Sequence, residues 1–468
     1  DDKSVGLAHT RLSIVDLSSS ANQPMSNRDN TIYIVYNGEV YNHDLIKKEL
    51  IKLGVKDWKT DHSDTEVVLK SFEYWGIKSI EKFRGMFSIA IWDDQKKELW
   101  VVRDRVGIKP LYYTFHNNTF ICASEIKAIL SDLSFPRSID EKSFFNFLSF
   151  SVVPSPSTLF KGINKLPPGT WLKISLDGSI KSCKYWDIKD NAKQFHNMSD
   201  NDITENIIEE LHTSIRLRKM SDVPVGVFLS GGLDSSLNAR LFSSNSDVKT
   251  FSVAYKDDFS GSPSELPYAR QMAQFINSNH HEHMISMDEV LEFVKKMAYH
   301  QDEPIADAVC IPLYYVAKLA KENGVTVCQV GEGADELFFG YRGFRRLLSL
   351  EKFYRSPIPF ALNDFGLKLL SFFGKLNRLD YWLEKTGRIK GGMPMFWTGT
   401  EPYAGNTKMN ILSDRMKNKF MDYSSYEIID PIWNNFKESS LNKSPMSWYA
   451  YADLNIRLPE LLLMRVDK

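Results

Sequence analysis

The sequence has few cysteines, no long apolar run and almost no net charge. The cysteines are widely spaced, with no CxxC pair, at Cys122, Cys183, Cys310 and Cys328. This usage is typical of reduced cytoplasmic proteins and excludes a disulfide scaffold. No apolar stretch approaches the ~20 residues that a membrane-spanning helix needs, and the first residues lack a signal-peptide pattern. We therefore expect a cytoplasmic protein without a membrane partner.

The overall charge gives no reason to expect a nucleic-acid partner. The formal net charge is −1 and the isoelectric point is about 6.9, so no global field draws the chain to anionic polymers. Hydrophobic residues make up 43% and charged residues 25% of the 468 residues, as in globular proteins of two or more domains. Small-molecule substrates are the expected partners, and a homodimer is left open.

Residues 1–186 show many short strand patterns. They occur at residues 31–36, 87–92, 98–103, 111–114, 119–123, 171–175 and 184–186, several of them joined by short polar turns. Helical patterns cover residues 45–53 and 65–75. Strands paired through short turns predict an antiparallel α+β domain over residues 1–186, followed by a polar linker over residues 187–202.

Residues 203–468 follow another pattern. Short apolar strands at residues 225–229, 250–255 and 325–330 alternate with helical segments, including residues 268–276 and 312–322. This alternation predicts a parallel, doubly wound α/β sheet, which binds ligands beyond the carboxyl ends of its strands. Residues 344–382 read as mostly helical and add helices to this domain.

The most informative motif lies between the first of these strands and a helix. It reads Ser230, Gly231, Gly232, Leu233, Asp234, Ser235 and Ser236. Adjacent glycines and a helix N-terminus direct backbone N–H groups at one point, which suits a phosphate. The lysine of a Walker loop is missing. We interpret the motif as an ATP pyrophosphate site used for adenylation; the alternative is an ordinary Gly/Ser turn.

A second motif, residues 331–341, follows the strand that ends at Val330. It contains three acids, Glu332, Asp335 and Glu336. In a parallel sheet this loop opens on the same edge as the first motif. Asp234 and Asp335 are then expected to share Mg²⁺ with the triphosphate, and Glu332 to take a proton from an attacking amine. The alternative is that the acids only stabilise a helix N-terminus.

In the first domain, Asn37, Gly38 and Glu39 follow the strand ending at Tyr36. An asparagine amide and a glycine N–H suit an oxyanion hole. Arg11 suits a carboxylate, and Glu39 or Asp64 suits an ammonium group, so the set fits an α-amino acid. The alternative is a plain Asn-Gly hairpin turn.

Two further patterns are weaker. Asp302, Glu303 and Pro304 are interpreted mainly as the end of a helix before proline; the alternative is that the acids help to hold the acceptor or a metal. His280, His281 and His283 fit no standard metal-ligand spacing, so a solvated loop or strand edge is favoured over a metal site.

Taken in order, these motifs resemble the glutamine-hydrolysing asparagine synthetase family across essentially the whole chain. The matching blocks are residues 9–16, 36–42, 63–66, 84–87, 103–113, 123–127, 166–169, 230–236, 331–341 and 458–468.

The resemblance implies an N-terminal glutaminase with the αββα sandwich of the N-terminal-nucleophile hydrolases, and a C-terminal adenine-nucleotide α-hydrolase-like sheet. It implies ATP and Mg²⁺, and ammonia passing through an internal tunnel to an aspartyl adenylate, giving asparagine, AMP and PPi. Asn37 and Gly38 would form the oxyanion hole and Glu332 would assist the adenylate. Glutamine would be bound by Arg11, Leu12, Ser13, Ile14, Val15, Asn37, Gly38, Glu39 and Asp64. Beside the 230–236 loop, ATP would be lined by Leu229, Val253, Val330 and Gly331.

The chain departs from the family pattern in several places. The family's N-terminal nucleophilic cysteine is absent, and Cys122 lies too far downstream in sequence to be expected to replace it. Both ends read as cut, so we expect a fragment that lacks its glutaminase nucleophile and part of its synthetase domain. Val330 and Phe339 stand where many relatives carry serine and glycine. Two other functions stay open: the same chemistry on another carboxylate, such as a sugar uronate, and a non-catalytic assembly partner.

Overall fold

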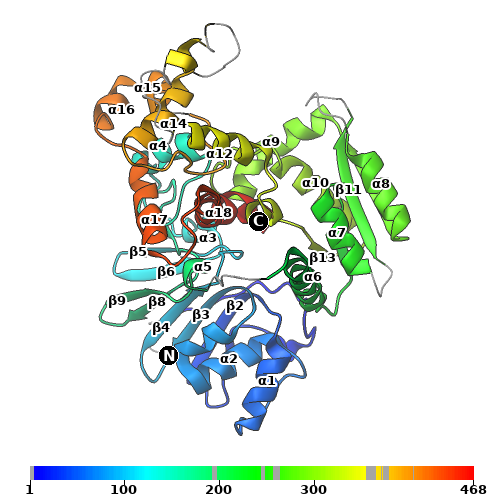
Figure 1. The fold of residues 1–468 in the computed structure, drawn as a ribbon. Coiled ribbons are helices and arrows are strands. Elements are labelled where there is room, and N and C mark those ends of the chain that lie inside the picture. The colour runs from blue at the N-terminus through cyan, green and yellow to red at the C-terminus, as the bar shows by residue number, and fades with distance from the viewer. Residues whose placement is uncertain are drawn as a thin grey trace.

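The computed structural model describes residues 5–191, 198–243, 248–256, 264–354, 365–369, 372, 379–403 and 405–467. Figure 1 shows antiparallel sheets formed by the N-terminal part, a parallel sheet at the right of the view, and helices from the last third of the chain packed above the antiparallel sheets. The C-terminus lies between these parts (Figure 1).

The N-terminal part contains the strands β1 (Met25–Ser26), β2 (Ile32–Val40), β3 (Gly85–Asp93), β4 (Glu98–Arg103), β5 (Tyr112–His116), β6 (Thr119–Ala123), β7 (Asn164–Lys165), β8 (Thr170–Ser175) and β9 (Ile180–Lys184). Its helices are α1 (His43–Lys52), α2 (Asp64–Trp75), α3 (Ile126–Ile129), α4 (Glu141–Phe150) and α5 (Ile188–Asn191), with short 3₁₀ turns at η1 (Ser19–Ala21) and η2 (Gly76–Lys82).

These strands form two stacked antiparallel sheets. The larger has the order β1-β2-β3-β4-β8-β9 and the smaller β6-β5-β7. Alternate residues of β3 enter two different cores, because successive side chains of a strand point to opposite faces. Ile89 shares a core with Val68 and Phe72 of α2. Its neighbour Ala90 shares another with Leu111 and Leu166 beside the smaller sheet.

Helices α3 and α4 complete the fourth layer. Ile126 and Phe150 share a buried core with Tyr112 of the smaller sheet. The order of layers is therefore helix, sheet, sheet, helix, which confirms the αββα sandwich expected for this part of the chain.

The C-terminal part contains the strands β10 (Val225–Phe228), β11 (Lys249–Tyr255), β12 (Asn279–Ile285) and β13 (Val327–Gln329). Around them lie α6 (Asp200–Leu217), α7 (Leu233–Phe242), α8 (Leu266–Phe275), α9 (Met287–Gln301), α10 (Cys310–Glu322) and α11 (Ala334–Phe338). The remaining helical elements are α12 (Arg342–Tyr354), α14 (Leu379–Lys390), α15 (Gly405–Ile411), α16 (Asp414–Lys419), α17 (Tyr426–Glu438), α18 (Pro445–Asn455), the π-helical turn η4 (Leu458–Leu462) and α19 (Leu463–Val466).

All pairs of the second sheet are parallel, in the order β12-β11-β10-β13. Val227 of β10 shares a core with Ala239 of α7 and Ala269 of α8. Phe251 of β11 shares another with Val316 of α10. Helices therefore cover both faces, and the doubly wound α/β sheet is confirmed. The strand order reverses between β10 and β13, the place where such sheets bind ligands.

The expected division at residues 187–202 stays a prediction, and the structure adds a complication. Helix α6 already begins at Asp200, inside the expected linker, with a capping box formed by Ser199 and Asp202. Trp448 and Leu461 of the C-terminal helices also share one core with Tyr112 and Phe150. The last helices of the chain therefore pack as part of the N-terminal sandwich.

Several element boundaries differ from the sequence-based expectations. Strand β2 continues through Asn37 and Gly38 to Val40, so the Asn-Gly hairpin turn is wrong, as is a strand end at Tyr36. Asn37 and Gly38 pair with Ser88 and Phe87 of β3, and this pairing overrides the turn propensity of the dipeptide. Residues 185–186 lie outside β9. Part of the range 344–382 falls outside the described residues.

The histidines at 280, 281 and 283 lie on β12, the edge strand of the parallel sheet, which confirms the strand-edge interpretation. Two of them, His280 and His283, have ordinary structural partners. His280 Nδ1 lies 2.8 Å from Thr250 Oγ1, and His283 Nε2 lies 2.9 Å from Glu289 Oε1.

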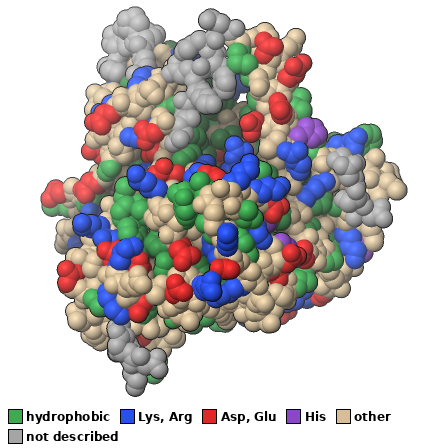
Figure 2. All heavy atoms as spheres, turned by 90° about the horizontal axis from the view of Figure 1, so that it is seen from below, with side chains coloured by type: hydrophobic (Ala, Val, Ile, Leu, Met, Phe, Trp, Pro, Cys, Tyr) green, Lys and Arg blue, Asp and Glu red, His purple; other side chains and the backbone are tan. Residues whose placement is uncertain are grey.

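The surface carries both signs of charge. On the face in Figure 2, basic and acidic side chains are interspersed, in agreement with the net charge of −1. Among the described residues, no helix combines the length and apolar character that crossing a bilayer requires.

Candidate active site

A cavity of about 720 Å³ opens between the N-terminal loop and the ends of β2 and β6. Eight of the nine predicted glutamine-binding residues line it, and Ser13 does not: the eight are Arg11, Leu12, Ile14, Val15, Asn37, Gly38, Glu39 and Asp64. Other residues that line the cavity were not predicted as site residues; among them are His9, Gln23, Thr65, Lys109, Cys122 and Ser124. Most of them lie in or beside the sequence blocks that resemble the family, and this position is the signal that could have identified them.

Gly38 is fixed by a close approach of β2 and β3. Its φ is +154°, and a Cβ added there would lie 2.1 Å from the carbonyl oxygen of Met86. Only glycine fits without moving the strand. Next to it, Asn37 Nδ2 donates to Ser124 Oγ at 3.3 Å. The two residues proposed to receive an oxyanion are thus held on a paired strand.

Two buried carboxyl groups, those of Glu39 and Asp64, line this cavity. Asp64 accepts hydrogen bonds from the hydroxyl of Tyr36 (2.9 Å) and the backbone N–H of Val40 (3.1 Å), yet burial raises its pKa. Burial and then the charge of Asp64 raise the pKa of Glu39 to about 7, against the opposing effect of Lys109 and Arg218. The cavity therefore holds negative charge that a cationic ligand would stabilise.

Arg11 organises the loop that forms one wall. Its two Nη atoms donate to the backbone carbonyls of Ser18 (2.9 Å), Val15 (3.1 Å) and Asp16 and to the side chain of Asn22 (3.2 Å). Binding of a carboxylate by Arg11 stays a prediction, because these loop contacts already occupy both nitrogens.

Cys122 lies closer to this cavity than its sequence position suggests. It is on β6 and lines the cavity wall. Burial raises the pKa of its thiol to about 12. Since the thiolate is the nucleophile, the burial of the thiol, rather than its distance along the sequence, argues against Cys122 as a replacement nucleophile.

The second candidate site lies where β10 and β13 end side by side. Gly232 is the N-cap of α7, and Ser230 Oγ and Ser235 Oγ lie 2.9 Å apart across the turn. A Cβ on Gly331 would lie 3.7 Å from the backbone of Asp234. The two predicted loops therefore meet at the reversal point of the sheet.

Leu229 and Val253, the remaining predicted ATP residues, belong to the adjoining strand ends. Leu229 is buried directly after β10, and its N–H donates to Phe251 O at 2.9 Å. Its carbonyl accepts from the hydroxyl of Ser252, next to Val253 on β11. The arrangement keeps the end of β10 in register with β11.

The three acids of the second motif have three different environments. Asp335 lies near Asp234, and the pKa of Asp234 is raised by burial and then by the charge of Asp335. Glu336 is buried and accepts the hydroxyl of Tyr341 at 2.5 Å, so its role is structural.

Arg465 holds the side chain of Glu332. Arg465 lies in the block 458–468 that resembles the family, but no role was predicted for it from the sequence. Arg465 Nη2 donates to Glu332 Oε1 at 3.1 Å, and Nη1 contacts Asp307. Burial raises the pKa of Glu332, and the charge of Arg465 opposes this shift. A raised pKa makes this carboxylate a stronger proton acceptor than an exposed glutamate.

The fit of a metal ion rests on the pair Asp234 and Asp335. Asp335 is close enough to raise the pKa of Asp234. Two neighbouring carboxylates suit a hard divalent cation, and Mg²⁺ is commonly held by one or two carboxylates plus phosphate oxygens. Within the described ranges no group of three or more metal-ligating side chains occurs. The residues therefore fit Mg²⁺ that arrives with a triphosphate.

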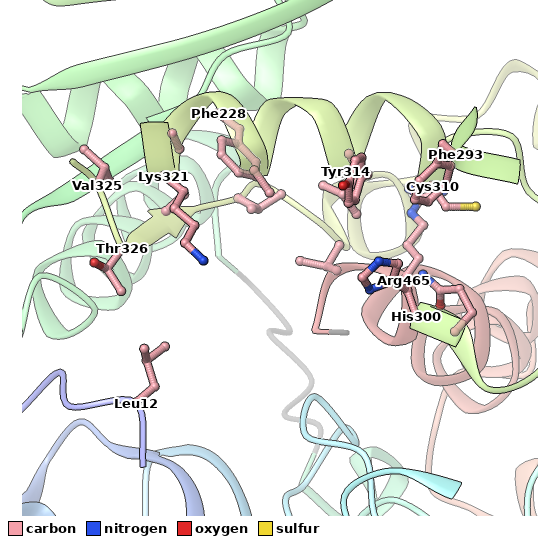
Figure 3. A pocket seen from close by; sticks show the side chains of 17 residues that line it. Leu12, Phe228, Phe293, His300, Cys310, Tyr314, Lys321, Val325, Thr326 and Arg465 are labelled. Carbon is pink, nitrogen blue, oxygen red and sulfur yellow. The ribbon is translucent and has the colours of Figure 1, made fainter. Parts of the chain in front are cut away.

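A second cavity, of about 600 Å³, lies beside this site (Figure 3). It is lined by α10, by the segment leading into β13, by Val330 and by Arg465. Figure 3 shows Leu12 on the opposite side from Lys321 and Tyr314 of α10. Leu12 also lines the 720 Å³ cavity, so one side chain borders both.

Phe339 takes a backbone conformation that is unusual for a residue with a side chain. It is the C-cap of α11 with φ +57°, in the left-handed region, which favours glycine at helix ends. Its ring packs edge-on against Phe344, with centroids 6.4 Å apart.

Asp302 and Glu303 do more than end a helix. Helix α9 ends at Gln301, as expected. The carboxylate of Asp302 accepts the backbone N–H of Ile126 at 3.0 Å. Lys165 Nζ lies 3.2 Å from Glu303 and 3.0 Å from Glu460. Both acids therefore join the segment after α9 to the N-terminal sandwich.

Comparison with known families assigns a domain to each part of the chain. Residues 1–186 match the model of the glutamine amidotransferase domain, and residues 206–468 match that of asparagine synthase. The glutamine-hydrolyzing asparagine synthetase 1 of Bacillus subtilis (strain 168) is 35% identical over 473 residues, covering 100% of this chain and 70% of that protein.

Two other relatives match over a smaller share of their own length. Asparagine synthetase 3 of the same strain is 31% identical over 353 residues, covering 72% of this chain and 56% of that protein. Amidase chry2 of Gibberella zeae is 33% identical over 368 residues, covering 74% of this chain and 52% of that protein. From the full-length match and the two domain models, the chain belongs to the asparagine synthase family of carbon–nitrogen ligases, which carry a glutamine amidotransferase domain.

Proposed function

We propose that the protein converts aspartate to asparagine with ATP and with ammonia released from glutamine. The observation that carries the proposal is the meeting of the two loops at the reversal point of the parallel sheet, where Gly331 lies against Asp234. The 230–236 turn would hold the phosphates through backbone N–H groups at the start of α7. The α-phosphorus would then lie where a carboxylate can attack it.

Glu332 would act on the proton that the incoming ammonia must lose. Its carboxylate is partly buried and oriented by Arg465 at 3.1 Å, so it is positioned to accept a proton. Asp234 and Asp335 would hold Mg²⁺, which supplies charge neutralisation for the triphosphate when it is bound.

The N-terminal cavity would bind glutamine. Glu39 and Asp64 supply negative charge for its ammonium group, and Asn37 with Gly38 would receive the oxyanion. Leu12, which borders both cavities, supports passage of ammonia from one to the other. Cleavage of glutamine would require the family's N-terminal cysteine in the native protein.

A PPi-release assay on the intact native protein tests the proposal. With MgATP and ammonia, aspartate should give PPi and asparagine. Glu332→Gln should lower the rate by at least about 100-fold, the typical contribution of a general base. Glu322→Gln, at an exposed position of α10, is the matched control and should leave the rate unchanged.

The choice of carboxylate is the second arm of the assay. The relative named amidase chry2 carries a different name from the asparagine synthetases, which supports variation of the acceptor among relatives. PPi release with a uronate-bearing nucleotide sugar but not with aspartate would replace aspartate by that acceptor. Absence of PPi with every carboxylate tested would refute the ligase proposal and favour a non-catalytic partner.

A further inference from the structure

The segment between α6 and β10 contacts the loop that lines the glutamine cavity. Asp222 is the centre of this contact. Its carboxylate Oδ2 accepts the backbone N–H of Asp16 at 2.7 Å. Its own backbone N–H donates to the carbonyl of Ile14 at 2.9 Å. Two bonds of opposite direction therefore fix the loop at residues 14–16 against the C-terminal part of the chain.

His62 adds a third connection to the same carboxylate. Its Nε2 lies 2.6 Å from Asp222 Oδ2, and its Nδ1 lies 3.1 Å from Asp61 Oδ2. His62 is two residues before Asp64, which begins α2 and lines the glutamine cavity. The Asp222 carboxylate thus contacts two of the chain segments that contribute walls to that cavity.

The other end of this connection is the nucleotide loop. Asp222 is three residues before Val225, the first residue of β10. That strand is held between β11 and β13 and runs directly into the 230–236 turn. A rigid paired strand is the kind of element that can carry a displacement from one of its ends to the other.

We propose that Asp222 is an interdomain positioning residue that couples nucleotide occupancy of the 230–236 turn to the shape of the glutamine cavity. Nucleotide binding orders the turn and β10, and Asp222 transfers that order to Ile14 and Val15, which line the cavity. The coupling is reciprocal, so glutamine must favour nucleotide by the same factor. This inference rests on the proposed function for the identity of the two ligands.

The expected size of the coupling between the two ligands follows from the exposure of the His62–Asp222 ion pair. The side chains of His62 and Asp222 are 41% and 37% exposed, so their ion pair is partly screened and contributes modestly. The two backbone hydrogen bonds add to it. A coupling factor of about 5 to 10, at the low end of allosteric coupling, is therefore expected.

The charges around His62 give the coupling a pH dependence. The titratable groups that face it are Asp61, Asp222 and Asp16, all acidic, and the hydrogen bond to Asp222 is the main reason why its pKa is raised. Protonated His62 strengthens the contact. Coupling should therefore be largest below the pKa of His62 and fall as pH rises through it.

The experiment measures two quantities on the full chain. Titration calorimetry gives the Kd of glutamine with and without a nonhydrolysable ATP analogue plus Mg²⁺. Hydrogen exchange of residues 11–18 with and without that analogue gives a readout that needs no glutamine. The variants are Asp222→Asn, which keeps the shape and the backbone N–H, and His62→Gln. Glu292→Gln, which removes an exposed pair with Lys296 on α9, is the matched control.

The expected result is that the analogue lowers the Kd of glutamine about 5- to 10-fold and slows exchange at residues 11–18 in the wild type and in the control. In Asp222→Asn both effects should fall to less than twofold, while the Kd of the analogue alone stays unchanged. In His62→Gln the pH dependence should disappear.

Equal effects in the wild type and Asp222→Asn would overturn the proposal, as would a wild type in which the analogue binds without altering exchange at residues 11–18. Failure of the proposed function is distinguishable from both. Glutamine would then not bind at all, whereas the exchange measurement would still decide whether Asp222 connects the turn to the loop.

Discussion

Replacing Glu39 by glutamine should stabilise the protein and remove its affinity for glutamine. Glu39 is 7% exposed, and burial together with Asp64 raises its pKa from 4.5 to about 7. Because the folded state binds this proton more tightly than the unfolded state, folding stability falls as pH rises from 4.5 to 7. Above pH 7 the charged form costs about 3 kcal/mol, at 1.4 kcal/mol for each pH unit. Glu39→Gln has the same shape and avoids that cost.

The same charge is what a ligand ammonium group would bind. If ionised Glu39 binds glutamine, about one-tenth of the protein is competent at pH 6 and nine-tenths at pH 8. The Kd of glutamine should therefore fall about tenfold from pH 6 to pH 8. Titration calorimetry measures this, and urea unfolding at pH 5 and pH 8 measures stability.

In the stability measurement, Glu39→Gln also serves as the control for the other titratable groups, including His62. Subtracting the pH dependence of the unfolding free energy of this variant from that of the wild type leaves the contribution of Glu39. A Kd that does not change between pH 6 and pH 8, or a variant no more stable than the wild type at pH 8, would refute this account of the cavity.

Two further substitutions test features that do not depend on the ligand. Gly38→Ala places a Cβ 2.1 Å from Met86 O, whereas the Cβ of Gly54→Ala meets no atom within 4 Å, although Gly54 also has a positive φ of +91°. In urea unfolding, the loss of stability should be about 2–3 kcal/mol larger for Gly38→Ala than for Gly54→Ala. Equal losses would contradict the clash. Lys408 is 2% exposed, and burial lowers its pKa from 10.5 to about 7. Between pH 7 and pH 9 the unfolding free energy of the wild type should therefore rise by about 2–3 kcal/mol more than that of Lys408→Met. If the two unfolding free energies changed with pH in parallel, this pKa would be wrong.

Local patterns were sufficient for much of the architecture. Alternation of strands and helices after residue 203 predicted the parallel sheet, because consecutive parallel strands need a long crossover connection, which is usually a helix. The turn at 230–236 was identified from its glycines and serines alone. Strand ends were less certain: Asn37 and Gly38 read as a turn, yet nine paired positions between β2 and β3 hold them in the ladder.

Other parts of the site depend on residues that are distant in sequence. Arg465 reaches Glu332 across 133 positions, and Asp222 reaches Asp16 across 206. Neither contact follows a sequence periodicity or a fixed residue spacing that would have predicted it. The shared core of Trp448 with Phe150 was likewise hidden, because apolar residues do not specify which partner they bury against.

The sequence by itself determined the two kinds of sheet, the family, and the residue types offered at each loop, because hydrophobic periodicity and turn chemistry are local properties. Only the tertiary structure decided how these pieces act on one another. It placed Leu12 beside both cavities and buried the Cys122 thiol. It also buried Glu39 close to Asp64, and burial together with the charge of Asp64 raises the pKa of Glu39 to about 7. Burial and charge proximity depend on the whole fold, so no segment of the chain carries them alone.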